Sequence, residues 1–193
     1  KTKIKIEKCK KIEKGTEIVF VPDETIFETT EFSPKKLYEF IKMKAVLVRG
    51  TSIDFKIDKE LIVDSTPSYE KFHFKNGIAD FLDIKSKNTA KLFDKYFSIV
   101  KYINDTEKCE IFISFNQNEK SSLISFCNTI ETPDGGSHEN SFKNGIIKAI
   151  KLYGQKNQVS KISNVSINDL IDYSDIIISI FINEPSFEGQ TKK

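Results

Sequence analysis

The fold of this chain is decided by Ile176-Ile177-Ile178-Ser179-Ile180-Phe181, an almost uninterrupted apolar run near its end. A continuous run of this kind is typical of a strand that is buried on both faces of a sheet. Such a strand requires neighbouring strands and covering helices, and the preceding residues must supply them.

Two segments upstream of this run predict a pair of strands. Ile111, Ile113 and Phe115 recur at every second position, as the residues on one face of a strand do. The polar residues 116–120 indicate a turn, and residues 123–127 return as a second strand. We therefore expect a β-hairpin here.

A helix is predicted between this hairpin and the apolar run. Residues 133–136 form a Pro-Asp-Gly-Gly loop, after which apolar residues recur at helical spacing. Those on the predicted buried side are Phe142, Ile146, Ile147, Ile150 and Tyr153. Ser166 and Asp169 resemble a capping box that starts another short helix. The order predicts a right-handed βαβ crossover in an α+β fold, with a mixed sheet and helices packed on one face.

The first half of the chain predicts a strand unit followed by a helix and shorter elements. Residues 2–6 and 17–21 alternate between polar and apolar, with Gly15 at the turn between them. Ser33 and Pro34 start a helix that runs to about Val46. The other expected elements are strands at residues 53–57, 72–74 and 97–103, a short helix at 77–84 and a solvated connection at 85–95.

Composition argues against several classes of protein. The 193 residues are 38% hydrophobic and 30% charged, with a net charge of +2, so no overall basic field indicates nucleic-acid binding. Arg49 is the only arginine, which argues against guanine readout by several arginines. Cys9, Cys109 and Cys127 form no CxxC pair, which argues against structural zinc and a disulfide framework. No apolar run approaches the ~20 residues that span a bilayer, so we expect a cytoplasmic chain without membrane contact, and its abrupt start suggests a fragment.

The two histidines are not predicted to bind metal. His73 is expected to face outward from its strand. His138 lies at the start of a helix, where only Glu139 and Asp134 could add ligands, so capping or local hydrogen bonding is the favoured role. Ser137 and His138 are adjacent, and neighbouring residues rarely place a nucleophile and its base within reach of each other.

A series of lysines follows the Gly-Gly loop: Lys143, Lys148, Lys151 and Lys156. They could form a solvated helix face or a stripe that faces nucleic-acid phosphates without sequence specificity, and both interpretations stay open.

The last motif of the chain has the chemistry of a phosphate contact. It reads Phe187-Glu188-Gly189-Gln190-Thr191-Lys192. The ammonium of Lys192 can pair with a phosphate, and the amide of Gln190 can donate and accept hydrogen bonds. A polar tail after the last strand is the alternative. The chain has neither a Gly-rich Walker loop nor a GxGxxG motif.

Several blocks in order resemble the B subunit of bacterial type IIA topoisomerases, DNA gyrase and topoisomerase IV. They are residues 15–27, the Asn-Thr-Ile of residues 128–130, the Gly-Gly-Ser-His-Glu loop with its helix, and Gln190-Thr191-Lys192. Ser137 stands where the family usually has threonine, which keeps the hydroxyl. Residues 42–47 look more like topoisomerase IV than gyrase.

The resemblance implies a domain organisation and roles for individual residues. Residues 1–23 would be the last strands of an upstream ATPase domain, and residues 24–193 a transducer domain that ends at the Gln-Thr-Lys loop. Lys192 and Gln190 would contact the γ-phosphate of ATP bound upstream. The loop of Gly135, Gly136, Ser137 and His138 would be structural. The family's catalytic and magnesium-binding residues would lie upstream, so no catalytic or metal-binding residue is expected here.

The resemblance also implies a function and partners. The chain would couple ATP binding and hydrolysis to clamp closure and DNA strand passage by an isomerase, and it would be inactive alone. ATP and Mg²⁺ would be held by the full subunit. The partners would be an A-type subunit in a heterotetramer, a second B subunit in an ATP-dependent dimer, and double-stranded DNA. Lys143, Lys148 and Lys151 are the residues that could face this DNA.

Two other hypotheses draw on the same residues. A free-standing Lys-rich α+β module would bind nucleic-acid backbones non-specifically, but it explains neither the terminal motif nor the strand unit at residues 2–21. A small-molecule kinase with the same crossover would need a phosphate-cradling loop, which the sequence lacks.

Overall fold

The computed structural model describes residues 15–85, 89–117, 119 and 121–187, which fall into two compact units. One unit ends at Ser33 and the other starts at Pro34. In the first, Phe20 and Phe32 pack edge to face with ring centroids 6.1 Å apart. The expected strand at residues 17–21 is wrong, because no described residue pairs with it and a strand forms only against a partner. Residues 2–6 lie outside the described residues, and the domain boundary after residue 23 stays a prediction.

The second unit contains four α-helices, two short 3-10 helices and seven strands among the described residues. The helices are α1 (Pro34–Leu47), η1 (Lys59–Leu61), α2 (Ile78–Lys85), α3 (Ser137–Lys156), η2 (Ser160–Asn164) and α4 (Ile167–Ile171). The strands are β1 (Ser52–Lys56), β2 (Tyr69–His73), β3 (Phe97–Tyr102), β4 (Lys108–Phe115), β5 (Ser122–Cys127), β6 (Ile130–Glu131) and β7 (Ser174–Phe181). In the described part of the chain, no helix is long and apolar enough to cross a bilayer.

The five-stranded sheet has the order β3-β4-β7-β5-β6, and β1 pairs with β2 in a separate hairpin. β7 runs antiparallel to β4 and parallel to β5. The predicted hairpin between residues 111 and 127 is therefore wrong, because β7 lies between its two strands. Adjacent strands lie about 4.8 Å apart, so a connection of six residues is long enough to pass one intervening strand. Because β7 lies between β4 and β5, its apolar run is hydrogen-bonded along both edges.

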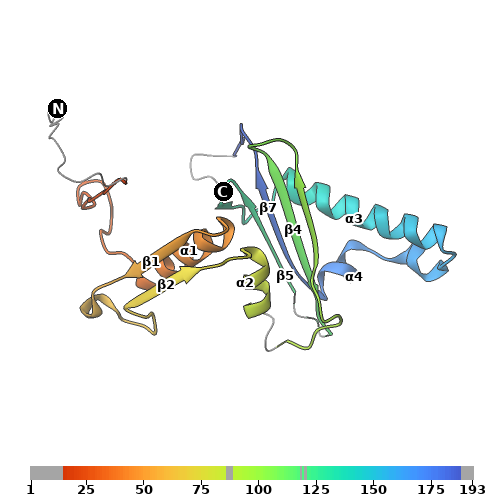
Figure 1. Cartoon of the computed structure of the whole chain (residues 1–193), viewed down its shortest axis with the longest axis horizontal. Helices are drawn as coiled ribbons and strands as arrows, with labels where there is room; N and C mark the ends of the chain where they lie inside the picture. Colours follow the sequence, from red (N-terminus) through yellow and green to blue (C-terminus); the bar gives the residue numbers. More distant parts are fainter. Residues whose placement is uncertain (1–14, 86–88, 118, 120, 188–193) are drawn as a thin grey trace. The chain divides into compact units, whose positions relative to one another are not determined.

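Both faces of the sheet are covered, one by α1 and α2 and the other by α3 and α4 (Figure 1). Ile177 belongs to the core cluster that contains α1, α2 and the β1–β2 hairpin. Ile176 and Ile178 point the other way and pack with Phe142 of α3. The α+β class and the doubly buried strand are confirmed, whereas the single layer of helices is corrected to two. The reason is the side-chain alternation of β7, which presents isoleucine to each face.

The first half of α3 packs on the sheet and its second half packs elsewhere. Phe142 is buried, as predicted, but Tyr153 is 63% exposed, so its predicted place on the buried side is wrong. Near the end of the helix, Gly154 packs against η2, where an added Cβ would lie 2.7 Å from the Cβ of Ile162. The helical period alone does not tell where the sheet beneath the helix ends. The capping box of Ser166 and Asp169 is confirmed at the start of α4.

A buried carboxylate joins the end of α1 to the sheet. Glu110 of β4 is 4% exposed and accepts hydrogen bonds from Arg49, at 3.2 Å, and from Lys108, at 2.9 Å. Two cations around one carboxylate compensate for the loss of its hydration. The single arginine of the sequence therefore has a structural partner.

A second polar cluster holds the start of β7. Asp175 is 7% exposed and accepts hydrogen bonds from Lys85 of α2, at 3.0 Å, from Asn116, at 3.1 Å, and from Ser122 of β5. Burial raises the pKa of Asp175, but the hydrogen bonds from Ser122, Asn116 and Lys85 outweigh it and hold the pKa below its usual value. The cluster thus ties β7 to α2 and to β5 through one ionised group.

We predict that Asp175→Asn lowers stability in a pH-dependent manner. The variant keeps the side-chain shape but leaves Lys85 without its charged partner, which should cost about 1–2 kcal/mol at neutral pH, because Lys85 is partly exposed. The folded pKa of Asp175 lies below its unfolded value of about 3.9, so its contribution is complete above that pH and is lost as pH falls through the folded pKa.

Urea unfolding of wild type and Asp175→Asn should therefore give free energies that differ near pH 7 and converge below about pH 4. A difference that stays constant over this range would show that the charge of Asp175 does not contribute.

Candidate functional site

The phosphate-contact motif lies at the end of the segment that leaves β7. Gln190 and Lys192 lie outside the described residues, so their predicted contact with a γ-phosphate stays a prediction. The described chain continues from β7 to Phe187, and we call residues 182–187 the exit segment. Its Asn183 N–H donates to Oε1 of Glu107, in the connection between β3 and β4, at 3.1 Å. The beginning of the exit segment is therefore held by the connection between β3 and β4.

The Gly-Gly loop allows two side chains of α3 to fold back over it. Gly135 has φ +76, in the left-handed region that favours glycine, and an added Cβ would lie 3.0 Å from Oε2 of Glu139. At Gly136, an added Cβ would lie 2.9 Å from two atoms of the His138 ring. Because neither glycine has a Cβ, the Glu139 carboxylate and the His138 imidazole can lie directly against the loop.

These two side chains belong to a polar network, which we call the loop cluster: Ser125, Thr132, His138, Glu139 and Lys143. The hydroxyl groups of Ser125 and Thr132 lie 2.7 Å apart, and Ser125 also donates to Glu139 at 3.2 Å. Thr132 Oγ1 lies 3.2 Å from Nε2 of His138, and Lys143 donates to Glu139. The loop cluster therefore joins the start of α3 to the β5–β6 hairpin.

His138 makes the local hydrogen bond that its position favours. Burial lowers the pKa of His138, and the nearby Glu139 only partly opposes this, so the imidazole is neutral at pH 7. The Nε2 of a neutral ring can donate or accept this hydrogen bond, depending on the tautomer. Ser137, the first residue of α3, adds no capping bond, because Gly136 occupies the N-cap position. The arrangement is one that stiffens a loop.

Sequence reasoning missed Ser125 and Thr132. Both residues are buried, at 2% and 7% exposure, although they carry hydroxyl groups. A serine in an otherwise apolar strand was the available signal, since a buried hydroxyl requires a partner. The identity of that partner depends on where α3 begins, which the strand itself does not reveal.

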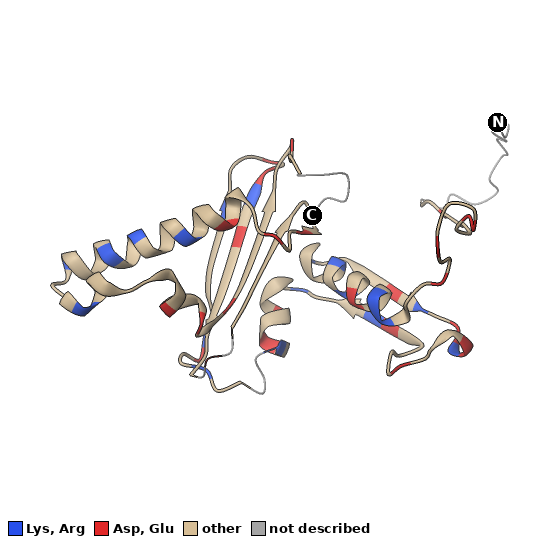
Figure 2. Cartoon of the chain, turned by 180° about the vertical axis from the view of Figure 1, so that it is seen from behind, with Lys and Arg blue, Asp and Glu red and all other residues tan. Residues whose placement is uncertain are grey.

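The lysines of α3 are not equivalent. Lys143 is paired with Glu139 one turn earlier, with its side chain 30% exposed. Lys148 and Lys151 are exposed and lie three positions apart, so they share a side of the helix. Glu139 is the only acidic residue of α3, and Figure 2 shows basic segments recurring along its length. The exposed side of α3 is therefore positive.

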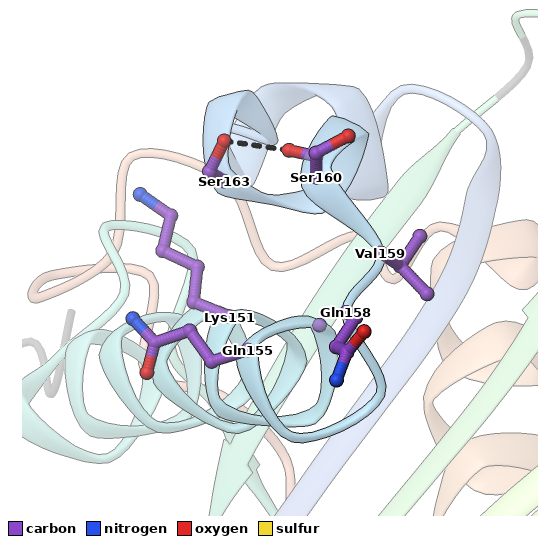
Figure 3. A pocket seen from close by; sticks show the side chains of 7 residues that line it. Lys151, Gln155, Gln158, Val159, Ser160 and Ser163 are labelled. Atoms are coloured by element: carbon purple, nitrogen blue, oxygen red, sulfur yellow. Dashed lines mark hydrogen bonds between the residues drawn. The ribbon is translucent and has the colours of Figure 1, made fainter.

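Lys151 also lines a pocket of about 330 Å³ between the end of α3 and η2. Lys151 extends from α3 toward Ser163, and Gln155 lies beside it (Figure 3). The hydroxyl of Ser163 donates to the carbonyl of Ser160 at 2.7 Å. Ammonium, amide and hydroxyl groups give this corner of the molecule a polar surface.

Comparisons with known proteins agree on one family. The family model described as DNA gyrase B matches residues 77–193. The B subunit of DNA topoisomerase 4 from Rickettsia felis is 38% identical over 190 residues, which cover 97% of this chain and 28% of that protein. The B subunit of DNA gyrase from Campylobacter jejuni is 34% identical over 180 residues, which cover 92% of this chain and 22% of that protein. The chain thus spans less than a third of the length of these relatives.

A solved structure supports the same relationship. The topoisomerase IV ATP-binding domain of Francisella tularensis, in complex with a small-molecule inhibitor, superposes with a TM-score of 0.67 and 27% identity. The match covers 89% of this chain and 44% of that domain. The sheet with its two helical layers is therefore an architecture that this family contains.

We predict that Gly136→Ala displaces the imidazole of His138. The added methyl group cannot lie 2.9 Å from the ring, so the ring must turn away and give up its hydrogen bond with Thr132, at a cost of about 1 kcal/mol. In a His138→Ala background, the same substitution meets no imidazole, so it has no hydrogen bond to disrupt. A double-mutant cycle measured by urea unfolding should therefore show coupling of about 1 kcal/mol between the two positions.

Gly145→Ala is the control in the same helix, because an added Cβ there meets nothing within 4 Å. It should raise the free energy of unfolding by about 0.5–1 kcal/mol, since alanine has the higher helix propensity. Additive effects of Gly136→Ala and His138→Ala would contradict the proposed contact.

Proposed function

Because this chain belongs to the DNA gyrase B family, we propose that it is the transducer region of a type IIA topoisomerase B subunit of the topoisomerase IV kind. Residues 1–23 would complete an upstream ATPase domain, and residues 24–193 would form the transducer. The single observation that carries this proposal is the family match over residues 77–193, which includes both the Gly-Gly loop and the terminal motif.

We propose that Lys192 and Gln190 sense the nucleotide. The ammonium and amide groups fit a terminal phosphate, which ATP would supply, and a hydrogen bond to a charged group contributes about 1.5–3 kcal/mol. A ligand shifts an equilibrium between two conformations only through its different affinity for each of them. Two such contacts, made only in one conformation, would favour that conformation by several kcal/mol. ATP and Mg²⁺ would be held by the upstream domain.

β7 would connect the sensor to the rest of the transducer. The strand is paired along both edges and buried on both faces, so it can move only together with the sheet. The exit segment starts where β7 ends, and Pro185 restricts its backbone. Displacement of Lys192 on hydrolysis would therefore release the whole sheet, which would couple the nucleotide to clamp closure and strand passage.

The exposed lysines of α3 would face the DNA segment that passes through the clamp. Lys148 and Lys151 form a positive surface without arginine, which suits contact with phosphates and carries no base specificity. Lys143 is engaged by Glu139 and would contribute less. The remaining partners would be a second B subunit and an A-type subunit in a heterotetramer.

We predict that Lys192→Ala strongly lowers ATP turnover in the full-length subunit while leaving its folding intact. Loss of one charged contact of about 1.5–3 kcal/mol corresponds to a decrease of roughly 10- to 100-fold in rate. Lys193→Ala is the matched control, because it removes the same charge one residue later and should change turnover little. ATP turnover of Lys192→Ala equal to that of wild type would refute the sensor role.

We predict that Lys148→Ala/Lys151→Ala weakens DNA binding by the full-length subunit and makes it less dependent on salt, because the variant removes ammonium groups that would pair with phosphates. Each such pair adds about 0.9 to the slope of log affinity against log salt concentration, so the double variant should lower this slope by up to about 2. Lys71→Ala, an exposed lysine of β2, is the control. If the double variant left the salt dependence of DNA affinity unchanged, the DNA would not contact Lys148 and Lys151. Tight, salt-dependent binding by this chain alone, with no effect of Lys192→Ala on turnover, would favour the free-standing module.

A further inference from the structure

The pairing of β5 with β7 continues beyond the end of β5 through a side chain. The parallel ladder runs from Ser122 opposite Asp175 to Cys127 opposite Ile180. The chain then turns away into β6 at Asn128, which has φ +49, and its N–H donates to the Ile180 carbonyl at 2.9 Å. Beyond this bond the backbone leaves the sheet, but the side chain of Asn128 stays beside the end of β7.

The carboxamide of Asn128 takes the place of the next peptide group. Its Nδ2 donates to the carbonyl of Ile182 at 2.9 Å, and its Oδ1 accepts from the N–H of Ile182 at 2.9 Å. An amide side chain carries one acceptor and a donor side by side, as a backbone peptide does. Both polar groups of the first residue of the exit segment are therefore satisfied by one side chain.

Few other residues could do this. An aspartate would keep an acceptor for the N–H of Ile182 but would turn an oxygen toward its carbonyl. A glutamine would be longer by one methylene group. Asparagine also tolerates the left-handed backbone that the turn requires, which most residues do not. The chemistry and the backbone conformation thus point to the same residue type.

The turn that carries Asn128 is held from two other elements. Lys44 of α1 donates to both the carbonyl and the hydroxyl of Thr129, at 2.5 and 2.9 Å. At the other end of the β5–β6 hairpin, Ser125 and Thr132 contact α3 through the loop cluster. The exit segment can move away from this hairpin only if both hydrogen bonds between Asn128 and Ile182 break. As long as they hold, the exit segment and the hairpin move together.

We infer that Asn128 is a positioning residue that sets the direction in which the chain leaves β7 toward Gln190 and Lys192, and that the β5–β6 hairpin links this exit to α3. This inference rests on the proposed function, since it gives the direction of the exit segment a role in nucleotide sensing. With Glu107 holding Asn183, the segment is fixed from both sides of β7.

The test compares Asn128→Gly, Asn128→Asp, Asn157→Gly and Lys192→Ala in the full-length subunit. Asn128→Gly keeps the left-handed turn and removes both bonds, and Asn128→Asp keeps the shape and removes the donor. Asn157→Gly is the control, because it removes the hydrogen bond of another asparagine side chain, to the carbonyl of Tyr153 at the exposed end of α3, and leaves the bonds to Ile182 intact. The measurements are hydrogen exchange at the Ile182 amide, kcat and KM for ATP, and affinity for ADP, which lacks the γ-phosphate.

For Asn128→Gly, we expect exchange at Ile182 to be faster by about tenfold and kcat to fall by a similar factor, with ADP affinity unchanged. Asn128→Asp should also lower kcat, and Asn157→Gly should match wild type. Normal turnover in Lys192→Ala would overturn the proposed function itself. A loss of turnover in Lys192→Ala, combined with wild-type kcat in both Asn128 variants, would overturn only this inference. Equal losses of ATP turnover and ADP affinity would show a merely structural role and would also overturn it.

Discussion

The structure depends on the burial of β7 at the centre of the sheet. Ile176 and Ile177 are fully buried and Ile178 is 1% exposed, although consecutive side chains point to opposite faces. Burial of each such side chain contributes about 1.5–3 kcal/mol, so both faces must be covered. The chain meets this requirement with two separate sets of helices. It also places a strand on each side of β7, so that none of the strand's backbone groups faces an apolar core without a partner.

Polar side chains act at the two ends of this apolar strand. At the start, the carboxylate of Asp175 is held by α2 and β5, and at the end, the carboxamide of Asn128 holds Ile182. Each contact joins residues that lie 53 to 90 positions apart in the sequence. The interior of β7 is thus packed among apolar side chains on both faces, while the polar contacts at its two ends hold the start of the strand and the direction in which the chain leaves it. Direction is what the proposed function requires of the segment that leads to Lys192.

The errors of prediction arise where local patterns have several tertiary solutions. Residues 111–127 have the pattern of a hairpin, and the same pattern allows another strand to enter between the two. Tyr153 has the correct helical phase for burial, but α3 has left the sheet by that point and packs on η2. The strand expected at residues 17–21 has an alternating pattern and finds no partner among the described residues. In each case the sequence pattern left open which segment would pack or pair with the element.

The sequence by itself determined most of the local elements and the family. The isoleucine run, the helix after the Gly-Gly loop and the capping box of Ser166 and Asp169 are local patterns, and the ordered motifs identify a type IIA topoisomerase B subunit. Only the tertiary structure decided that β7 separates β4 from β5, that helices cover both faces, and that Asn128 completes the ladder at Ile182. The physical reason is that strand pairing and side-chain hydrogen bonds join residues far apart in the chain. Their energies therefore depend on the packing of the whole sheet, which no local stretch of sequence specifies.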